Sequence, residues 1–202
     1  MKMKILEQAS NLFLEFGFKS VTMDDLSETL GVSKKTIYEH FDTKTQLVQE
    51  CADHIFQNVS CIIDELCSQN FDPITETLAI KDNVMKHLKN QKSSPQFQLQ
   101  KYYPAISQSL KQKQWDKMYE CYRDNLKRGI DQGYYRPDID VECVFRFYYN
   151  GINLVKDKKV FPHQEFSTGH VNDQYLEYHL RGIVTPKGLK RLEELLSEST
   201  LS

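Results

Sequence analysis

The sequence lacks any long apolar run, any internal repeat and any stretch of low complexity. A transmembrane helix needs about eighteen or more consecutive apolar residues, so we expect no contact with a membrane. The chain is 40% hydrophobic and 27% charged, with eight Gly and six Pro among 202 residues, which is ordinary for a folded protein. Disorder and a membrane-embedded protein are therefore not expected.

The cysteines include no CxxC pair, and their number is odd: Cys51, Cys61, Cys67, Cys121 and Cys143. This pattern suits reduced thiols in a cytosol better than a disulfide framework or a zinc site. We therefore expect a cytoplasmic protein whose cysteines are mostly small buried apolar residues, with a redox-sensing thiol as the open alternative. The histidines lack the i,i+4 spacing of a metal-binding pair, so we expect no metal and no cofactor.

The common catalytic motifs are also absent. The sequence contains no GxSxG, GxxxxGK[ST] or HExxH, so we expect no enzyme. An enzyme without a recognisable motif and a helical adaptor that binds other proteins remain alternatives. The net charge of −2 does not indicate a nucleic-acid ligand. If the N-terminal segment binds DNA, the attraction must come from the positions of a few lysines.

Apolar residues recur at helical spacing along most of the chain, and no segment alternates as a strand would. Three helix starts carry Pro at the first helical position after a capping residue, namely Asp72-Pro73, Ser94-Pro95 and Thr185-Pro186. Residues 156–170 lose the periodicity and are expected to form a loop. The pattern predicts an all-α protein with nine or ten helices, the last of them over residues 141–155, 171–181 and 186–197.

The first fifty residues predict three short helices followed by a long one. The first helix ends at Phe16, and Gly17 is expected to close it in the left-handed conformation. Thr22 and Asp25 form a capping-box pattern before a helix that Gly31 ends near Leu30. Ser33 caps a third helix, from Lys34 to about His40, and Thr43 with Gln46 caps the fourth.

Two short helices joined by a turn that contains Gly are the ingredients of a helix-turn-helix. The second helix of this motif presents its first residues to the major groove of DNA. Here that helix begins with Lys34 and Lys35, whose charges oppose the positive end of the helix dipole. A nearby polyanion would make these charges favourable, whereas two solvated surface lysines are the alternative.

The spacing of more than a dozen residues resembles the N-terminal signature of the tetracycline-repressor (TetR) family. The matching residues are Ile5-Leu6, Ala9, Leu12-Phe13, Gly17, Val21-Thr22, Leu26, Leu30-Gly31-Val32-Ser33, Thr36-Ile37-Tyr38, Phe41, Lys44 and Leu47. The resemblance implies a helix-turn-helix DNA-binding domain over residues 1–48 and a larger helical domain over residues 49–202. It also implies a homodimer that binds a double-stranded DNA operator and that a small-molecule effector releases.

Carried over by position, the resemblance implies a set of DNA-binding residues: Thr22, Ser33, Lys34, Lys35, Thr36, Tyr38, His40 and Lys44. Their hydroxyl, phenol, imidazole and ammonium groups can donate to phosphate oxygens or base edges. The family often has Gly where this chain has Lys35, which is long enough to reach a guanine edge. We expect Glu39 to pair with Lys35 rather than contact a cytosine. Core packing for Tyr38 and a dipole contact for His40 remain alternatives.

Aromatic residues gather in two parts of the remaining chain. One set suggests a pocket for a largely apolar or aromatic effector, although ordinary core packing explains any one residue equally well: Phe97, Tyr102, Tyr103, Trp115, Met118, Tyr119 and Tyr122. The other set lies in the helices over 140–155 and 171–181, which have more aromatic surface than one buried face requires. We predict a dimer interface there, formed by Phe145, Tyr148, Tyr149, Ile152, Tyr175, Leu176 and His179.

Overall fold

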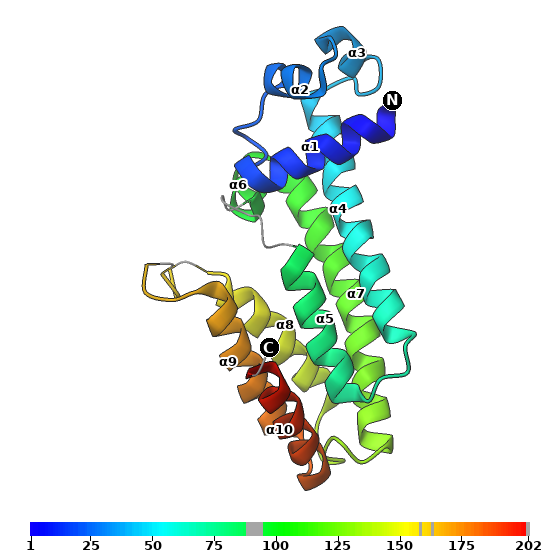
Figure 1. Cartoon of the computed structure of the whole chain (residues 1–202), viewed down its shortest axis with the longest axis vertical. Helices are drawn as coiled ribbons and strands as arrows, with labels where there is room; N and C mark the ends of the chain where they lie inside the picture. Colours follow the sequence, from blue (N-terminus) through cyan, green and yellow to red (C-terminus); the bar gives the residue numbers. More distant parts are fainter. Residues whose placement is uncertain (88–94, 158, 163, 201–202) are drawn as a thin grey trace. The chain divides into compact units, whose positions relative to one another are not determined.

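The computed structural model describes residues 1–87, 95–157, 159–162 and 164–200. This part of the chain is built from α-helices, and its one β-bridge, between Tyr135 and Val184, is isolated. The described residues form ten helices, which Figure 1 labels in chain order: α1 (Lys2–Phe16), α2 (Met23–Leu30), α3 (Lys34–Tyr38), α4 (Lys44–Cys67), α5 (Pro73–His87), α6 (Pro95–Tyr102), α7 (Pro104–Asp131), α8 (Val141–Val155), α9 (Thr168–Ile183) and α10 (Pro186–Thr200). The predicted all-α fold is therefore confirmed.

The N-terminal helices follow the predicted capping pattern with two differences. Gly17 has a positive φ of 91° but a ψ of 151°, so it is not in the left-handed helical conformation expected for it. Helix α3 ends at Tyr38, and His40 lies in the turn that follows. Gly31 does adopt the left-handed conformation, with φ 63° and ψ 32°, and it ends α2 as predicted.

The Pro signals mark true helix starts. Helices α5, α6 and α10 begin at Pro73, Pro95 and Pro186, while Ser94, the cap expected before α6, lies outside the described residues. Helix α9 starts three residues before the predicted position because the Ser167 hydroxyl caps it, accepting from the His170 N–H at 3.2 Å. The expected loop after α8 is correspondingly shorter.

The chain packs as two units, which are described separately. The first unit comprises Met1–Ile63 and Val84–Gln114, and the second comprises Asp64–Asn83 and Trp115–Ser202. The predicted boundary after residue 48 lies within α4 and inside the first unit, so this boundary stays a prediction. None of the helices in the described ranges is both long and apolar enough to cross a membrane.

The core of the first unit is formed by the N-terminal helices together with α6 and the start of α7. Its buried members come from α1, α2, α3, α4, α6 and α7, and include Ile5, Phe13, Leu26, Ile37, Leu47, Leu99 and Ile106. Because α2 and α3 each contribute a fully buried residue to this core, both short helices are held in place by α1 and α4.

The core of the second unit is rich in aromatic residues. It includes Ile74, Tyr122, Leu126, Tyr135, Phe145, Tyr148, Leu180 and Leu192. Helix α8 packs against α9, and their close approach depends on Gly151, where a Cβ would lie 2.1 Å from the Tyr175 ring. The Tyr175 hydroxyl donates to the carbonyl oxygens of Phe147 and Tyr148, which joins the two helices at the same place.

Candidate DNA-binding site

Helices α2 and α3 and the three residues between them form a helix-turn-helix. The turn is closed by a bond from the Val32 N–H to the Ser27 carbonyl and by the Ser27 hydroxyl, which donates to the Val32 carbonyl. Leu26 of α2 and Ile37 of α3 are fully buried, so the two helices share one core. This arrangement leaves the first turn of α3 at the surface, where a DNA groove can receive it.

Thr22 caps α2 through the complete capping box that its sequence predicts. Its hydroxyl accepts from the Asp25 N–H at 3.1 Å, while its own hydroxyl and N–H donate to the Asp25 carboxylate at 2.8 and 2.7 Å. These bonds hold the pKa of Asp25 below its ordinary value. Since both Thr22 donors already serve Asp25, a phosphate contact by Thr22 requires that one of these bonds opens.

The first turn of α3 carries four of the predicted DNA-binding residues. The Ser33 hydroxyl accepts from the Thr36 N–H at 3.1 Å and lies 2.9 Å from the Thr36 hydroxyl. Lys34 forms an ion pair with Asp24 of α2 at 2.6 Å, and this contact raises the pKa of Lys34. Asp24 is the partner that the sequence did not reveal, because the pair crosses the turn between two helices.

Lys35 is exposed and is oriented by no ion pair among the described residues. The pairing with Glu39 that we expected from their spacing is therefore wrong for this structure. Glu39 is the C-terminal cap residue of α3, and its N–H still bonds to the Lys35 carbonyl at 2.9 Å, so the backbone gives no explanation for the absent side-chain pair. The Lys35 ammonium is thus available to a ligand without the loss of an internal partner.

Tyr38, His40 and Lys44 occupy the end of α3 and the start of α4. Tyr38 is 44% exposed, so its ring is not a core residue, and His40 is half-buried. The Lys44 ammonium donates to the carbonyl oxygens of Lys19, at 3.2 Å, and of Val21. Burial, followed by repulsion from Lys19, lowers the pKa of Lys44. Lys44 therefore ties the connection between α1 and α2 to the start of α4.

The predicted effector residues fall in both packing units. Phe97, Tyr102 and Tyr103 belong to the first unit, where Phe97 is 61% and Tyr102 43% exposed. Trp115 and the remaining three members, Met118, Tyr119 and Tyr122, belong to the second unit. The assembly of all seven into one pocket stays a prediction.

Within the second unit, predicted effector residues pack against predicted dimer residues. Trp115 meets the rings of Phe145 and Tyr149 edge-on, at centroid distances of 4.8 and 4.7 Å. Tyr122 stacks on Tyr148 at 4.0 Å, and its hydroxyl lies 2.7 Å from Nε2 of His179. Burial lowers the pKa of His179 to about 4.

The predicted dimer residues need correction, because four of them are buried inside the chain itself. Phe145, Tyr148, Leu176 and His179 are at most 9% exposed, whereas Tyr149, Ile152 and Tyr175 are half-buried. Side chains in the core have almost no surface to offer to a second copy. The large exposed residues of these two helices are Phe147, at 71%, Leu154, at 50%, and Tyr178, at 79%.

A signal for these exposed residues was present in the sequence. The apolar stripe of α8 runs through Val141, Phe145, Tyr148 and Val155 and marks the face that packs inside the chain. Phe147 lies off that stripe, so the helical periodicity directs its side chain away from the buried face of α8.

Comparison with known proteins identifies the N-terminal domain. Residues 5–51 match the family model for bacterial regulatory proteins of the tetR family. The N-terminal part of the chain is a TetR-family helix-turn-helix domain. The protein is a DNA-binding transcriptional regulator, and the helix-turn-helix described above lies within the matched residues.

Two relatives match the chain over very different lengths. The HTH-type transcriptional repressor KstR2 of Mycolicibacterium smegmatis is 25% identical over 191 residues, which cover 93% of this chain and 92% of the repressor. The negative regulator IcaR of the biofilm operon icaADBC in Staphylococcus aureus is 35% identical over 66 residues, or 33% of this chain and 32% of IcaR.

The similar solved structures have the same fold. A TetR-family regulator from Agrobacterium tumefaciens aligns with a TM-score of 0.74 and 17% identity, covering 91% of this chain and 97% of that one. The ketosteroid transcriptional regulator KstR2 of Mycobacterium tuberculosis aligns with a TM-score of 0.59 and 20% identity, covering 91% and 95%. These likenesses extend the fold assignment beyond the helix-turn-helix to the rest of the chain.

Proposed function

We propose that the protein is a cytoplasmic repressor that binds an operator as a homodimer and is released from it by a largely apolar small molecule. The observation that carries the proposal is the capped helix-turn-helix with an exposed, unpaired Lys35 in the first turn of its second helix. A repressor of this kind needs a DNA-reading surface, a second copy of itself and an effector site that favours the released state.

For DNA binding, the proposed contacts differ in whether the side chain must first give up a partner within the protein. Lys35 is free to reach a guanine edge or a phosphate. Lys34 must leave Asp24, and Lys44 must leave two backbone carbonyls, before either ammonium turns fully to DNA. Tyr38 offers an exposed hydroxyl for a phosphate, while Ser33, Thr36 and His40 lie on the same segment. We assign the largest share of specific recognition to Lys35.

For the effector, the proposal draws on the aromatic residues of the second unit and on one relative. Trp115, Tyr119 and Tyr122 supply flat apolar surface with polar edges, as small-molecule sites do. The similar structure from Mycobacterium tuberculosis is that of a ketosteroid transcriptional regulator, and a steroid-like compound belongs to the apolar class expected from these residues. Such a ligand releases DNA only if it binds the DNA-incompetent state more tightly, typically by about 1–3 kcal/mol.

For dimerisation, we propose an interface on α8 and α9, the helices predicted from the sequence, but formed by other residues of these helices. Phe147 and Leu154 on α8 and Tyr178 on α9 are exposed apolar or aromatic side chains of two helices that pack against one another. Apolar residues exposed in one copy become favourable when a second copy covers them.

The proposed function is tested by measuring operator binding. A gel-shift assay with the DNA upstream of the protein's own gene should show a specific complex that dissociates on addition of an apolar ligand.

Phe147→Asp and Tyr178→Asp should each give a folded monomer, detected by light scattering, that binds the same DNA far more weakly. Asn150→Asp, an exposed change on the same helix that removes no apolar surface, is the matched control. A monomeric variant that binds as tightly as the native protein would refute the dimeric model.

A further inference from the structure

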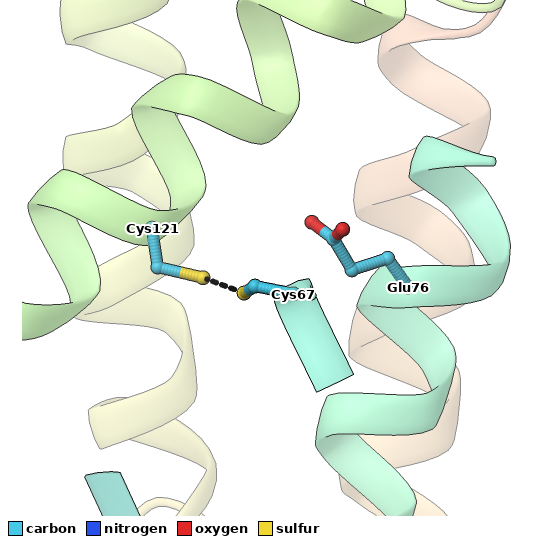
Figure 2. A group of neighbouring side chains, drawn as sticks. All are labelled: Cys67, Glu76 and Cys121. Atoms are coloured by element: carbon cyan, nitrogen blue, oxygen red, sulfur yellow. Dashed lines mark hydrogen bonds between the residues drawn. The ribbon is translucent and has the colours of Figure 1, made fainter. Parts of the chain in front are cut away.

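Two cysteines of the second unit lie against one another. Cys67 ends α4, Cys121 lies in the middle of α7, and their sulfur atoms are 3.1 Å apart. Figure 2 shows the two side chains pointing toward each other, with the carboxylate of Glu76 beside them. A disulfide bond is about 2.05 Å long, so the sulfurs need to approach by only about 1 Å. Cys67 is the last residue of its helix, which eases that movement.

A metal site explains this group less well than a thiol pair does. The three ligand atoms lie within 4.8 Å of one another. However, both oxygens of Glu76 accept from Arg128 at 2.7 Å, and one also accepts from Asn125 at 2.8 Å. A structural zinc site needs four ligands, and with Glu76 already engaged only the two sulfurs remain.

The two thiols differ in how easily they ionise. Burial raises the pKa of both thiols, and the hydrogen bond between them raises the pKa of Cys121 further. The hydrogen bond to Cys121 acts in the opposite direction on Cys67 and favours its thiolate. Because the thiolate is the reactive form, Cys67 is the sulfur that meets an oxidant first.

We propose that Cys67 and Cys121 form a peroxide-sensitive thiol pair that closes to an intramolecular disulfide. The Cys67 thiolate attacks one oxygen of hydrogen peroxide, which breaks the O–O bond and leaves a sulfenic acid on Cys67 and hydroxide. The Cys121 sulfur then attacks the Cys67 sulfur and expels a second hydroxide. The two thiol protons convert both hydroxides to water. Two thiols are oxidised and one peroxide is reduced.

The pair is tested in a background that removes the exposed thiols, Cys61→Ser with Cys143→Ser, which leaves Cys51, Cys67 and Cys121. After peroxide treatment and denaturation, a maleimide should label one thiol instead of three, and proteolysis should yield a Cys67–Cys121 linked peptide that dithiothreitol separates. Closing a link between residues 54 positions apart should also raise Tm by several degrees. The same linked peptide is expected from the native chain, so the result does not depend on these variants.

The order of the steps has its own test. Dimedone, which labels sulfenic acids, should modify Cys67 in Cys121→Ser and leave Cys121 unmodified in Cys67→Ser. Three labelled thiols after peroxide treatment would overturn the proposal, as would sulfenic acid confined to Cys121. One zinc ion per purified chain, lost in Cys67→Ser, would overturn it in favour of a metal site.

Discussion

The two packing units use polar side chains in different ways. In the helix-turn-helix, the helix caps join residues three positions apart: Thr22 with Asp25 and Ser33 with Thr36. In the second unit they join residues far apart in sequence, such as Glu76 with Arg128, 52 positions away, and Tyr122 with His179, 57 positions away. Local caps fix where short exposed helices begin, whereas the distant contacts hold whole helices together. Substitutions should therefore cost more stability in the second unit.

The largest effect is expected from Arg128→Ala. This change leaves the fully buried carboxylate of Glu76 with only Asn125 as partner. Breaking a buried ion pair costs about 3–5 kcal/mol, and the partial exposure of Arg128 places this one near the lower end. Urea unfolding measures the loss. Arg181→Ala, which removes exposed pairs with Glu177 and Glu193, is the control and should leave the urea midpoint nearly unchanged. Equal effects of the two changes would show that the buried carboxylate of Glu76 does not depend on Arg128.

The second effect is a pH dependence that His179 imposes on stability. Its pKa falls from 6.5 to about 4 on folding because burial disfavours the charged ring. The unfolded chain therefore takes up a proton between these values while the folded chain does not, so stability is lost as pH falls from 6.5 toward 4. Between pH 7 and pH 5 the loss is about 2 kcal/mol.

His179→Gln isolates this contribution, because other groups also titrate. The variant should lose less stability than the native protein when urea unfolding is compared at pH 7 and pH 5. His170→Gln, on the exposed start of α9, should behave like the native protein. An unchanged pH dependence in His179→Gln would show that the ring is not buried as described.

A smaller effect is expected from Gly151→Ala. The added Cβ would lie 2.1 Å from the Tyr175 ring, so the ring or the two helices must move. Overpacking of this kind costs about 1–3 kcal/mol, from which the better helix propensity of Ala returns up to about 1 kcal/mol. Gly182→Ala is the matched control, since nothing lies within 4 Å of its Cβ and it should be neutral or stabilising. Thermal unfolding that ranks Gly182→Ala as the more harmful would be inconsistent with this packing.

The smallest effect is expected in the helix-turn-helix itself. Thr22→Ala removes the cap of α2 and should cost about 1 kcal/mol, measured by thermal unfolding. Thr29→Ala, an exposed residue of the same helix, is the control and should change Tm little. A Thr22→Ala cost as large as that of Arg128→Ala would erase the difference between local and distant polar contacts.

The sequence predicted much of the fold because the relevant signals are local. The Thr22–Asp25 box, the left-handed Gly31 and the Pro starts of α5 and α10 all act within a few residues. Such signals carry their own geometry, so they could be identified before any tertiary contact was known. Gly17 departs from the expected conformation even so, and α9 begins earlier than its apolar pattern indicates.

The contacts that the sequence could not predict join distant or differently oriented segments. No spacing rule links Asp24 to Lys34 across a turn, or Lys44 to the carbonyls of Lys19 and Val21. Four of the seven predicted dimer residues are core residues instead, for a different reason. Aromatic content was counted over whole helices, although only the side chains off the apolar stripe, such as Phe147, remain exposed. The TetR resemblance supplied the DNA-binding residues, and their roles stay predictions.

The central claim is that α3 reads DNA, and the most direct measurement compares operator affinity for the native protein and Lys35→Ala. Lys35 makes no ion pair in the described structure, so its removal should leave the fold intact and act on DNA alone. We expect a loss of about 1–3 kcal/mol, a weakening of about 5- to 150-fold, with relaxed preference at one base pair. The native affinity should also fall steeply as salt rises. Equal affinity and equal sequence preference in the two proteins would contradict the assignment of Lys35 as the reading residue.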